Sequence, residues 1–111
     1  MKLEELVNKC GFEVITELYE PDSEISGGYS GDLLSDVIAN TEKNNLWITM
    51  QTHLNIIAVA SLKELSAIIV VMNRKIGSDT IEKAKEEKVT ILRTDKDSFK
   101  ISGMIYGLGV I

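Results

Sequence analysis

The 111-residue sequence predicts an α/β fold, with three α/β/α layers around a four- or five-stranded, mostly parallel sheet. Segments typical of strands alternate with segments whose apolar residues recur every three or four positions. Ala67–Met72 (AIIVVM) is continuously apolar and β-branched, which is typical of a strand covered on both faces. We therefore expect this strand at the centre of the sheet, with helices on both faces.

The first 31 residues predict one helix, one strand and a long irregular segment. The apolar residues of Leu3–Cys10 fall on one helical face, and Gly11 can end that helix. Phe12–Leu18 is typical of a strand. Residues 19–31 contain the only proline and three of the eight glycines, so we expect an irregular loop. A short extra strand around Ile25 would make the sheet mixed.

Helices and strands alternate along the remainder of the chain. Short polar residues that can accept hydrogen bonds from free amides mark several of the helix starts. The expected elements are a helix capped by Asp32 and reaching about Lys43, a strand at Leu46–Met50, a helix at Thr52–Lys63, the strand at Ala67–Met72, a helix from Asp79 through Lys88, a strand at Val89–Leu92 and a last helix opened by Asp95 or Asp97.

Composition excludes several classes of protein. A net charge of −5 argues against a nucleic-acid partner, because a phosphate backbone requires a cationic face. The single cysteine, Cys10, excludes an internal disulfide and fits a reducing cytoplasm. No apolar run approaches the ~20 residues of a membrane span, and the first residues have no signal-peptide core. We expect one cytoplasmic domain over residues 1–111, with no role in a membrane.

The only histidine, His53, follows a predicted strand and stands at a predicted helix start. Thr52 is expected to cap that helix, with His53 exposed and bonded to neighbours or water. Alternatively, the helix start lies at a carboxyl end of the sheet and faces an anion or nucleotide. The candidate ligand-binding residues are Gly27, Gly28, Gly31, Asp32, Thr52, His53 and Asn55.

No catalytic, metal or cofactor site is legible in the sequence. Neither a Walker A motif nor G-x-G-x-x-G occurs, and no nucleophile has a paired base. Asp32 and Asp36 lie one helical turn apart and could share a cation, although capping or solvation explains them as well. Cys10 and His53 lack the spacing of metal ligands. We therefore predict no catalytic residues, no metal and no cofactor.

The helix at Thr52–Lys63 is apolar on more than one face, which indicates burial on several sides. Either the first or last helix covers it within the chain, or a second copy does. The second possibility makes Ile56, Val59, Ala60 and Lys63 candidate residues of a homodimer interface. The last helix is the alternative interface, because its small residues permit close approach to the sheet or to a partner.

Three segments together resemble the DRTGG domain family, in particular its small stand-alone members. They are GGYSGDLLSDVIAN at 27–40, LWITMQTHLNIIAVASL at 46–62 and TIEKAKEEKVTIL at 80–92. The resemblance covers roughly residues 2–110. The family's Asp-Arg falls at Thr52-His53 and its Thr-Gly-Gly at about residues 72–74; this chain preserves neither.

The resemblance implies regulation more than catalysis. Similar domains lie between CBS domains in a class of inorganic pyrophosphatases, where they help form a homodimer and accompany adenine-nucleotide control. The implied fold is related to the N-terminal domain of HPr kinase/phosphatase, and some stand-alone relatives are labelled HPr serine kinases, although this chain has no P-loop. The first hypothesis is a non-catalytic regulatory or interaction module that forms a homodimer. The second is a sensor that binds an adenine nucleotide or another phosphate-bearing small molecule around Thr52–Asn55.

Overall fold

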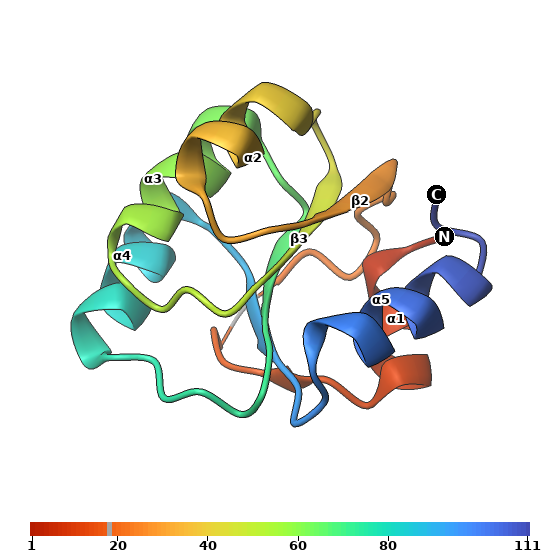
Figure 1. The fold of residues 1–111 in the computed structure, drawn as a ribbon. Helices are drawn as coiled ribbons and strands as arrows, with labels where there is room; N and C mark the ends of the chain where they lie inside the picture. The colour runs from red at the N-terminus through yellow and green to blue at the C-terminus, as the bar shows by residue number, and fades with distance from the viewer. Residues whose placement is uncertain (18) are drawn as a thin grey trace.

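The computed structural model describes residues 1–17 and 19–111 and confirms the three-layer α/β/α fold (Figure 1). In these residues none of the helices is long and apolar enough to span a membrane. The helices are α1 (Leu3–Cys10), α2 (Leu34–Asn40), α3 (Asn55–Lys63), α4 (Ser78–Glu87) and α5 (Ser98–Gly107). The strands are β1 (Glu13–Val14), β2 (Gly27–Ser30), β3 (Asn45–Thr49), β4 (Ala67–Val70) and β5 (Ile91–Arg93).

The five strands form one mixed sheet in the order β1-β5-β4-β3-β2. Neighbours from β2 to β5 are parallel, whereas β1 runs antiparallel to β5. In the centre, Ile69 of β4 pairs with Ile48 of β3 and Leu92 of β5. All four residues of β4 are buried. The prediction that this segment forms the central strand is therefore confirmed.

Helices cover both faces of the sheet and create two separate apolar cores. Figure 1 shows α1 and α5 on one face and α2, α3 and α4 on the other. Successive residues of β4 alternate between the two cores, because side chains of a strand point to opposite faces. Ile69 packs against the α1–α5 layer, and Ile68 packs against the α2–α4 layer. Full burial of each such side chain stabilises the fold by about 1.5–3 kcal/mol.

The amino-terminal third differs from the prediction in three ways. The mixed character of the sheet comes from β1, and the extra strand lies at Gly27–Ser30 instead of at Ile25. The Ile25 amide donates to the Met1 carbonyl at 2.9 Å, so this residue pairs with the chain start and not with the sheet. Of the strand expected at Phe12–Leu18, the described residues form only Glu13–Val14, and Leu18 lies outside them.

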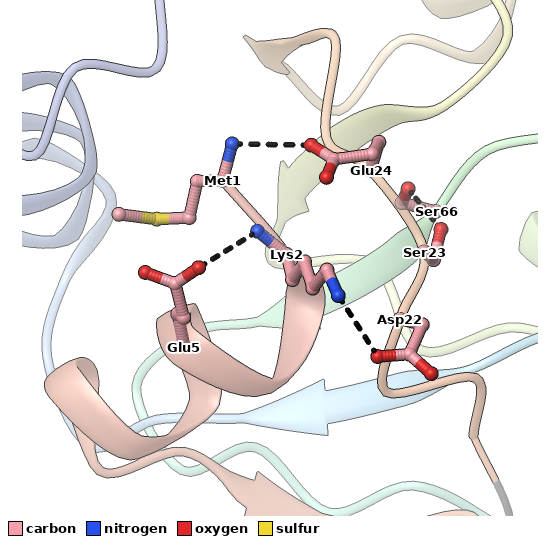
Figure 2. Close-up of polar contacts among 7 residues, drawn as sticks. All are labelled: Met1, Lys2, Glu5, Asp22, Ser23, Glu24 and Ser66. Carbon is pink, nitrogen blue, oxygen red and sulfur yellow. Dashed lines mark hydrogen bonds and ion pairs between the residues drawn. The ribbon is translucent and has the colours of Figure 1, made fainter.

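The chain start ties the irregular segment before β2 to α1 (Figure 2). Lys2 forms an isolated antiparallel bridge with Glu24, and the Leu3 amide donates to the Ser23 carbonyl at 2.9 Å. Two exposed ion pairs, Met1 amine to Glu24 and Lys2 Nζ to Asp22, each measure 3.3 Å. Exposed pairs contribute at most about 1 kcal/mol each, so the backbone bonds and packing position this segment more strongly.

The apolar circumference of α3 is covered within the chain. Ile56, Ile57, Val59 and Ala60 are buried, and α2 and α4 flank the helix. This corrects the argument for an α3 interface, because three of the four candidate residues are left with almost no surface for a partner. Neither α1 nor α5 supplies the cover, since both lie on the other face of the sheet.

Burial raises the pKa of the Cys10 thiol, and nearby Lys96 partly opposes that effect. A raised folded-state pKa means that the thiolate is less stable in the folded chain than in the unfolded one. The stability associated with the neutral thiol is present below the unfolded value of about 8.5 and is lost as the pH rises through the folded value.

We therefore expect the free energy of unfolding to fall more between pH 7.5 and pH 10 in the native chain than in Cys10→Ala. Urea unfolding of both proteins at both pH values measures the difference. Equal losses in the two proteins would contradict the prediction. Titration of lysine and tyrosine contributes equally in both proteins. The difference between the native chain and Cys10→Ala therefore reports the thiol alone.

Candidate functional site

Five of the seven candidate ligand residues lie at the carboxyl edge of the parallel strands. Gly31 and Asp32 follow β2, while Thr52, His53 and Asn55 lie between β3 and the first turn of α3. In parallel α/β sheets this edge is the usual place for a ligand, because the loops that follow the strands meet there. The sequence predicted this edge for the helix start around Thr52–Asn55, and the structure adds Gly31 and Asp32 to it.

The remaining two candidates, Gly27 and Gly28, lie at the opposite end of β2. They pair with Asn45 and Leu46 at the start of β3. A Cβ on Gly27 would stand 3.0 Å from the Ile111 carbonyl oxygen, so the chain end approaches the backbone closely here. Gly27 and Gly28 were expected in a loop, but they belong to β2. The length of this strand separates them from Asp32, which follows its other end.

Asp32 links the loop after β2 to the end of β3. Its Oδ1 accepts from the Thr49 hydroxyl and from the Met50 amide, both at 2.8 Å. The Gln51 side-chain amide also donates to the Asp32 carbonyl at 3.1 Å. Asp32 was expected to cap the second helix, but α2 begins at Leu34 with no side-chain cap bond among the described residues. The carboxylate orients the loop and is already occupied by two donors.

At the start of α3 the N-cap position is Leu54, and the side chain that accepts an amide of the first turn is His53 and not Thr52. His53 Nδ1 accepts from the Asn55 amide at 3.2 Å, and His53 is exposed as expected. In the part of the chain that the structure describes, the Thr52 hydroxyl makes no cap bond. The Thr52 carbonyl instead accepts from the Thr80 hydroxyl at 3.1 Å, which ties this segment to α4. The helix begins at Asn55, later than expected, and the side chain that accepts an amide of its first turn is therefore His53 instead of Thr52.

The turn after β4 has an unusual backbone that the sequence did not predict. Met72 and Asn73 are consecutive left-handed residues with φ of 59° and 52°. Their amides donate to the carbonyls of Lys96 and Thr94 at 2.9 and 2.8 Å, so two loops are joined at this edge. Asn tolerates this conformation, but Met gives no such signal. Arg74, which follows, is exposed and adds positive charge to the edge.

The residues at about 72–74 stand where the resembled family has Thr-Gly-Gly. Glycine adopts left-handed backbone at little cost, and two successive left-handed residues occur here. Of the two left-handed residues, only Asn73 falls on a glycine position of that motif, while Met72 falls on its threonine position.

Three of the cavities on the described surface lie elsewhere, since none of these three is lined by Asp32, Thr52, His53 or Asn55. One of about 290 Å³ lies beside the carboxyl ends of α3 and α4, and one of about 390 Å³ adjoins it near Tyr19. A third, of about 170 Å³, lies between β2 and α5. The described residues also contain no group of three potential metal ligands.

The hydrogen bond from the Asn55 amide to His53 predicts effects of different size for two neighbouring substitutions. His53→Ala should lower the free energy of unfolding by about 1 kcal/mol, because the Asn55 amide loses its acceptor. Thr52→Ala should stay within about 0.5 kcal/mol of the native chain. Urea midpoints at equal slopes measure both changes. A larger loss in Thr52→Ala than in His53→Ala would restore the original assignment of the cap.

Comparison with known proteins agrees with this architecture. The model of the DRTGG domain matches residues 30–108. The fold is similar to a crystal structure of the CBS and DRTGG domains of the regulatory region of Clostridium perfringens pyrophosphatase, complexed with its activator diadenosine tetraphosphate. The TM-score is 0.70 at 17% identity, over 94% of this chain and 45% of that chain, so this chain spans less than half of the regulatory region. Comparison with curated proteins finds no match. The chain belongs to the DRTGG domain family.

Proposed function

We propose that residues 1–111 act as one non-catalytic, cytoplasmic regulatory module that forms a homodimer. Membership of the DRTGG family supports a regulatory role, as does the similarity of fold to the regulatory region of a pyrophosphatase. The observation that carries the homodimer is an apolar surface at the carboxyl-terminal end of the chain. Phe99 is 87% exposed, and Tyr106 and Ile111 are also exposed, although the layers already cover both faces of the sheet.

The charge distribution favours a partner on this surface. The sequence has 29 charged side chains, yet residues 98–111 contain only Lys100. An acidic chain with a net charge of −5 repels its own copies, so a nearly neutral apolar region is where two copies approach at least cost. Exposed apolar patches of this kind are typical of interaction sites.

A second candidate function is a response to a small ligand at the helix start around Thr52–Asn55. The bond between the Thr80 hydroxyl and the Thr52 carbonyl joins the segment before α3 to the first turn of α4. Arg74 and Lys75 are exposed on the loop before α4. Helix amino termini together with cations suit a phosphate group. The ligand would be an adenine nucleotide or another phosphate-bearing small molecule, as the diadenosine tetraphosphate of the pyrophosphatase suggests.

The homodimer is tested by the mass of the native chain in solution. Light scattering after gel filtration at micromolar concentration should give twice the chain mass of 12.3 kDa. Dilution into the nanomolar range should produce a concentration-dependent decrease towards the single-chain mass, as expected for a reversible association. A mass of one chain at every micromolar concentration contradicts the homodimer.

The ligand response is tested by thermal unfolding with AMP, ADP, ATP and inorganic phosphate. A ligand at 100 times its Kd should stabilise the folded chain by about 2.7 kcal/mol. Arg74→Ala should weaken that response, whereas Lys9→Ala, an exposed change on α1, should leave it unchanged. An absence of any shift at millimolar nucleotide removes the sensor and leaves the dimeric module standing.

A further inference from the structure

The outer edge of β2 is open. This strand is the last in the sheet order, and among the described residues it pairs with β3 alone. The Gly31 amide donates to the Ile48 carbonyl at 3.0 Å. Because backbone groups alternate in direction along a strand, the amides and carbonyls of Gly28 and Ser30 point away from β3. Both residues are exposed, so two residues present donors and acceptors along one line.

This edge lacks the features that normally prevent strand pairing. Natural proteins protect exposed edges with lysine, proline, bulges or very short strands. Residues 25–31 contain no charged residue and no proline. The other edge of the sheet differs, because β1 has two residues and Glu13 forms a 2.8 Å ion pair with Arg93. One edge is therefore guarded by charge and shortness, and the other is free to pair.

Apolar side chains flank the open edge on both faces of the sheet. On the α5 face, β2 offers only Gly28 and Ser30, which leaves the cavity of about 170 Å³ between strand and helix. The same cavity is lined by Ile48, Ser102, Ile105, Tyr106, Val110 and Ile111. On the other face, the loop before α2 and α2 itself carry exposed Leu33 and Ile38. Figure 1 shows β2 between α2 and α5, with the chain end beside it.

We infer that a second copy of this chain pairs antiparallel with the open edge of β2 and extends the sheet across a two-fold axis. The inference rests on the proposed homodimer and assigns its interface. The outward groups lie two residues apart, so Gly28 can pair with Ser30 of the partner subunit while Ser30 pairs with Gly28 of the partner subunit. Each such pair exchanges two backbone hydrogen bonds. Tyr29 then faces Tyr29 of the partner subunit on the axis.

The interface is self-complementary, as a two-fold dimer requires. Each copy brings an uncharged strand, an open apolar cavity and the exposed side chains of Tyr106 and Ile111. Extending the sheet places the α5 helices of the two copies next to each other, where these side chains cover the cavities from the opposite copy. An acidic partner of the same sequence meets almost no like charge along this contact.

Ser30→Pro tests the backbone part of the interface. The substitution removes the outward amide and leaves the bonds to β3 in place, and edge strands tolerate proline. By symmetry two hydrogen bonds are lost, so the Kd of the dimer should rise by about tenfold or more. Sedimentation or light scattering over a dilution series measures the change, and circular dichroism checks that the variant is folded.

Tyr106→Glu tests the side-chain part without altering the strand. Its matched control is Leu62→Glu on α3, because the two native side chains are 67% and 68% exposed. Tyr106→Glu should give the single-chain mass at micromolar concentration, whereas Leu62→Glu should remain dimeric. Dissociation by Leu62→Glu with a dimeric Tyr106→Glu overturns this interface and moves the contact to α3.

Amide hydrogen exchange reports the pairing directly in the native chain. The amides of Gly28 and Ser30 should exchange slowly when the chain is dimeric and rapidly after dilution to the single-chain state. Rapid exchange at both positions in a sample of dimeric mass overturns the β2 interface, while the proposed homodimer survives. A single-chain mass at all concentrations overturns both. Protection that appears only when another protein is added assigns the edge to a different partner and also overturns the inference.

Discussion

The cover that β4 requires on both faces is the constraint on which the rest of the structure depends. Its four residues are buried, and Ile68 and Ile69 belong to different cores. A strand of this kind is stable only inside three layers, so helices must cover the parallel strands on both faces. Each of the five helices in residues 1–17 and 19–111 serves as such cover. This arrangement also aligns the loops after β2, β3, β4 and β5 at one edge.

Several polar side chains at the carboxyl ends of the parallel strands hold neighbouring loops together. Asp32, Thr49 and Thr80 sit at the carboxyl edge, and their side chains join one loop or strand end to another. His53 Nδ1 accepts the Asn55 amide in the first turn of α3. A ligand at this edge therefore has to rely on exposed groups such as Arg74 and Lys75, and not on the polar residues that already hold the loops together.

Because helices cover both faces of the sheet, its two outer strands, β1 and β2, are the parts of the sheet left for association with a partner. The β1 end is two residues long and carries an ion pair. The β2 end has open backbone groups beside apolar side chains of α2 and α5. The apolar α3, which indicated a dimer from the sequence, is buried because α2 and α4 pack against it within one chain. The apolar character of α3 therefore reflects burial within one chain, and it is not evidence for the proposed association at β2.

The sequence by itself determined the fold class, the central strand and the position of the helix start around Thr52–Asn55 at the carboxyl ends of the strands. Periodicity and the apolar run Ala67–Met72 are local signals, and the burial they indicate does not depend on details of neighbours. Asp97 as the cap of α5 was likewise one of two readable choices, and its Oδ1 accepts the Lys100 amide at 2.8 Å. Only the tertiary structure decided that Gly27 lies in a strand and what covers Val59. Each of these depends on contacts between segments far apart in the chain, and a local pattern contains no information about such a partner.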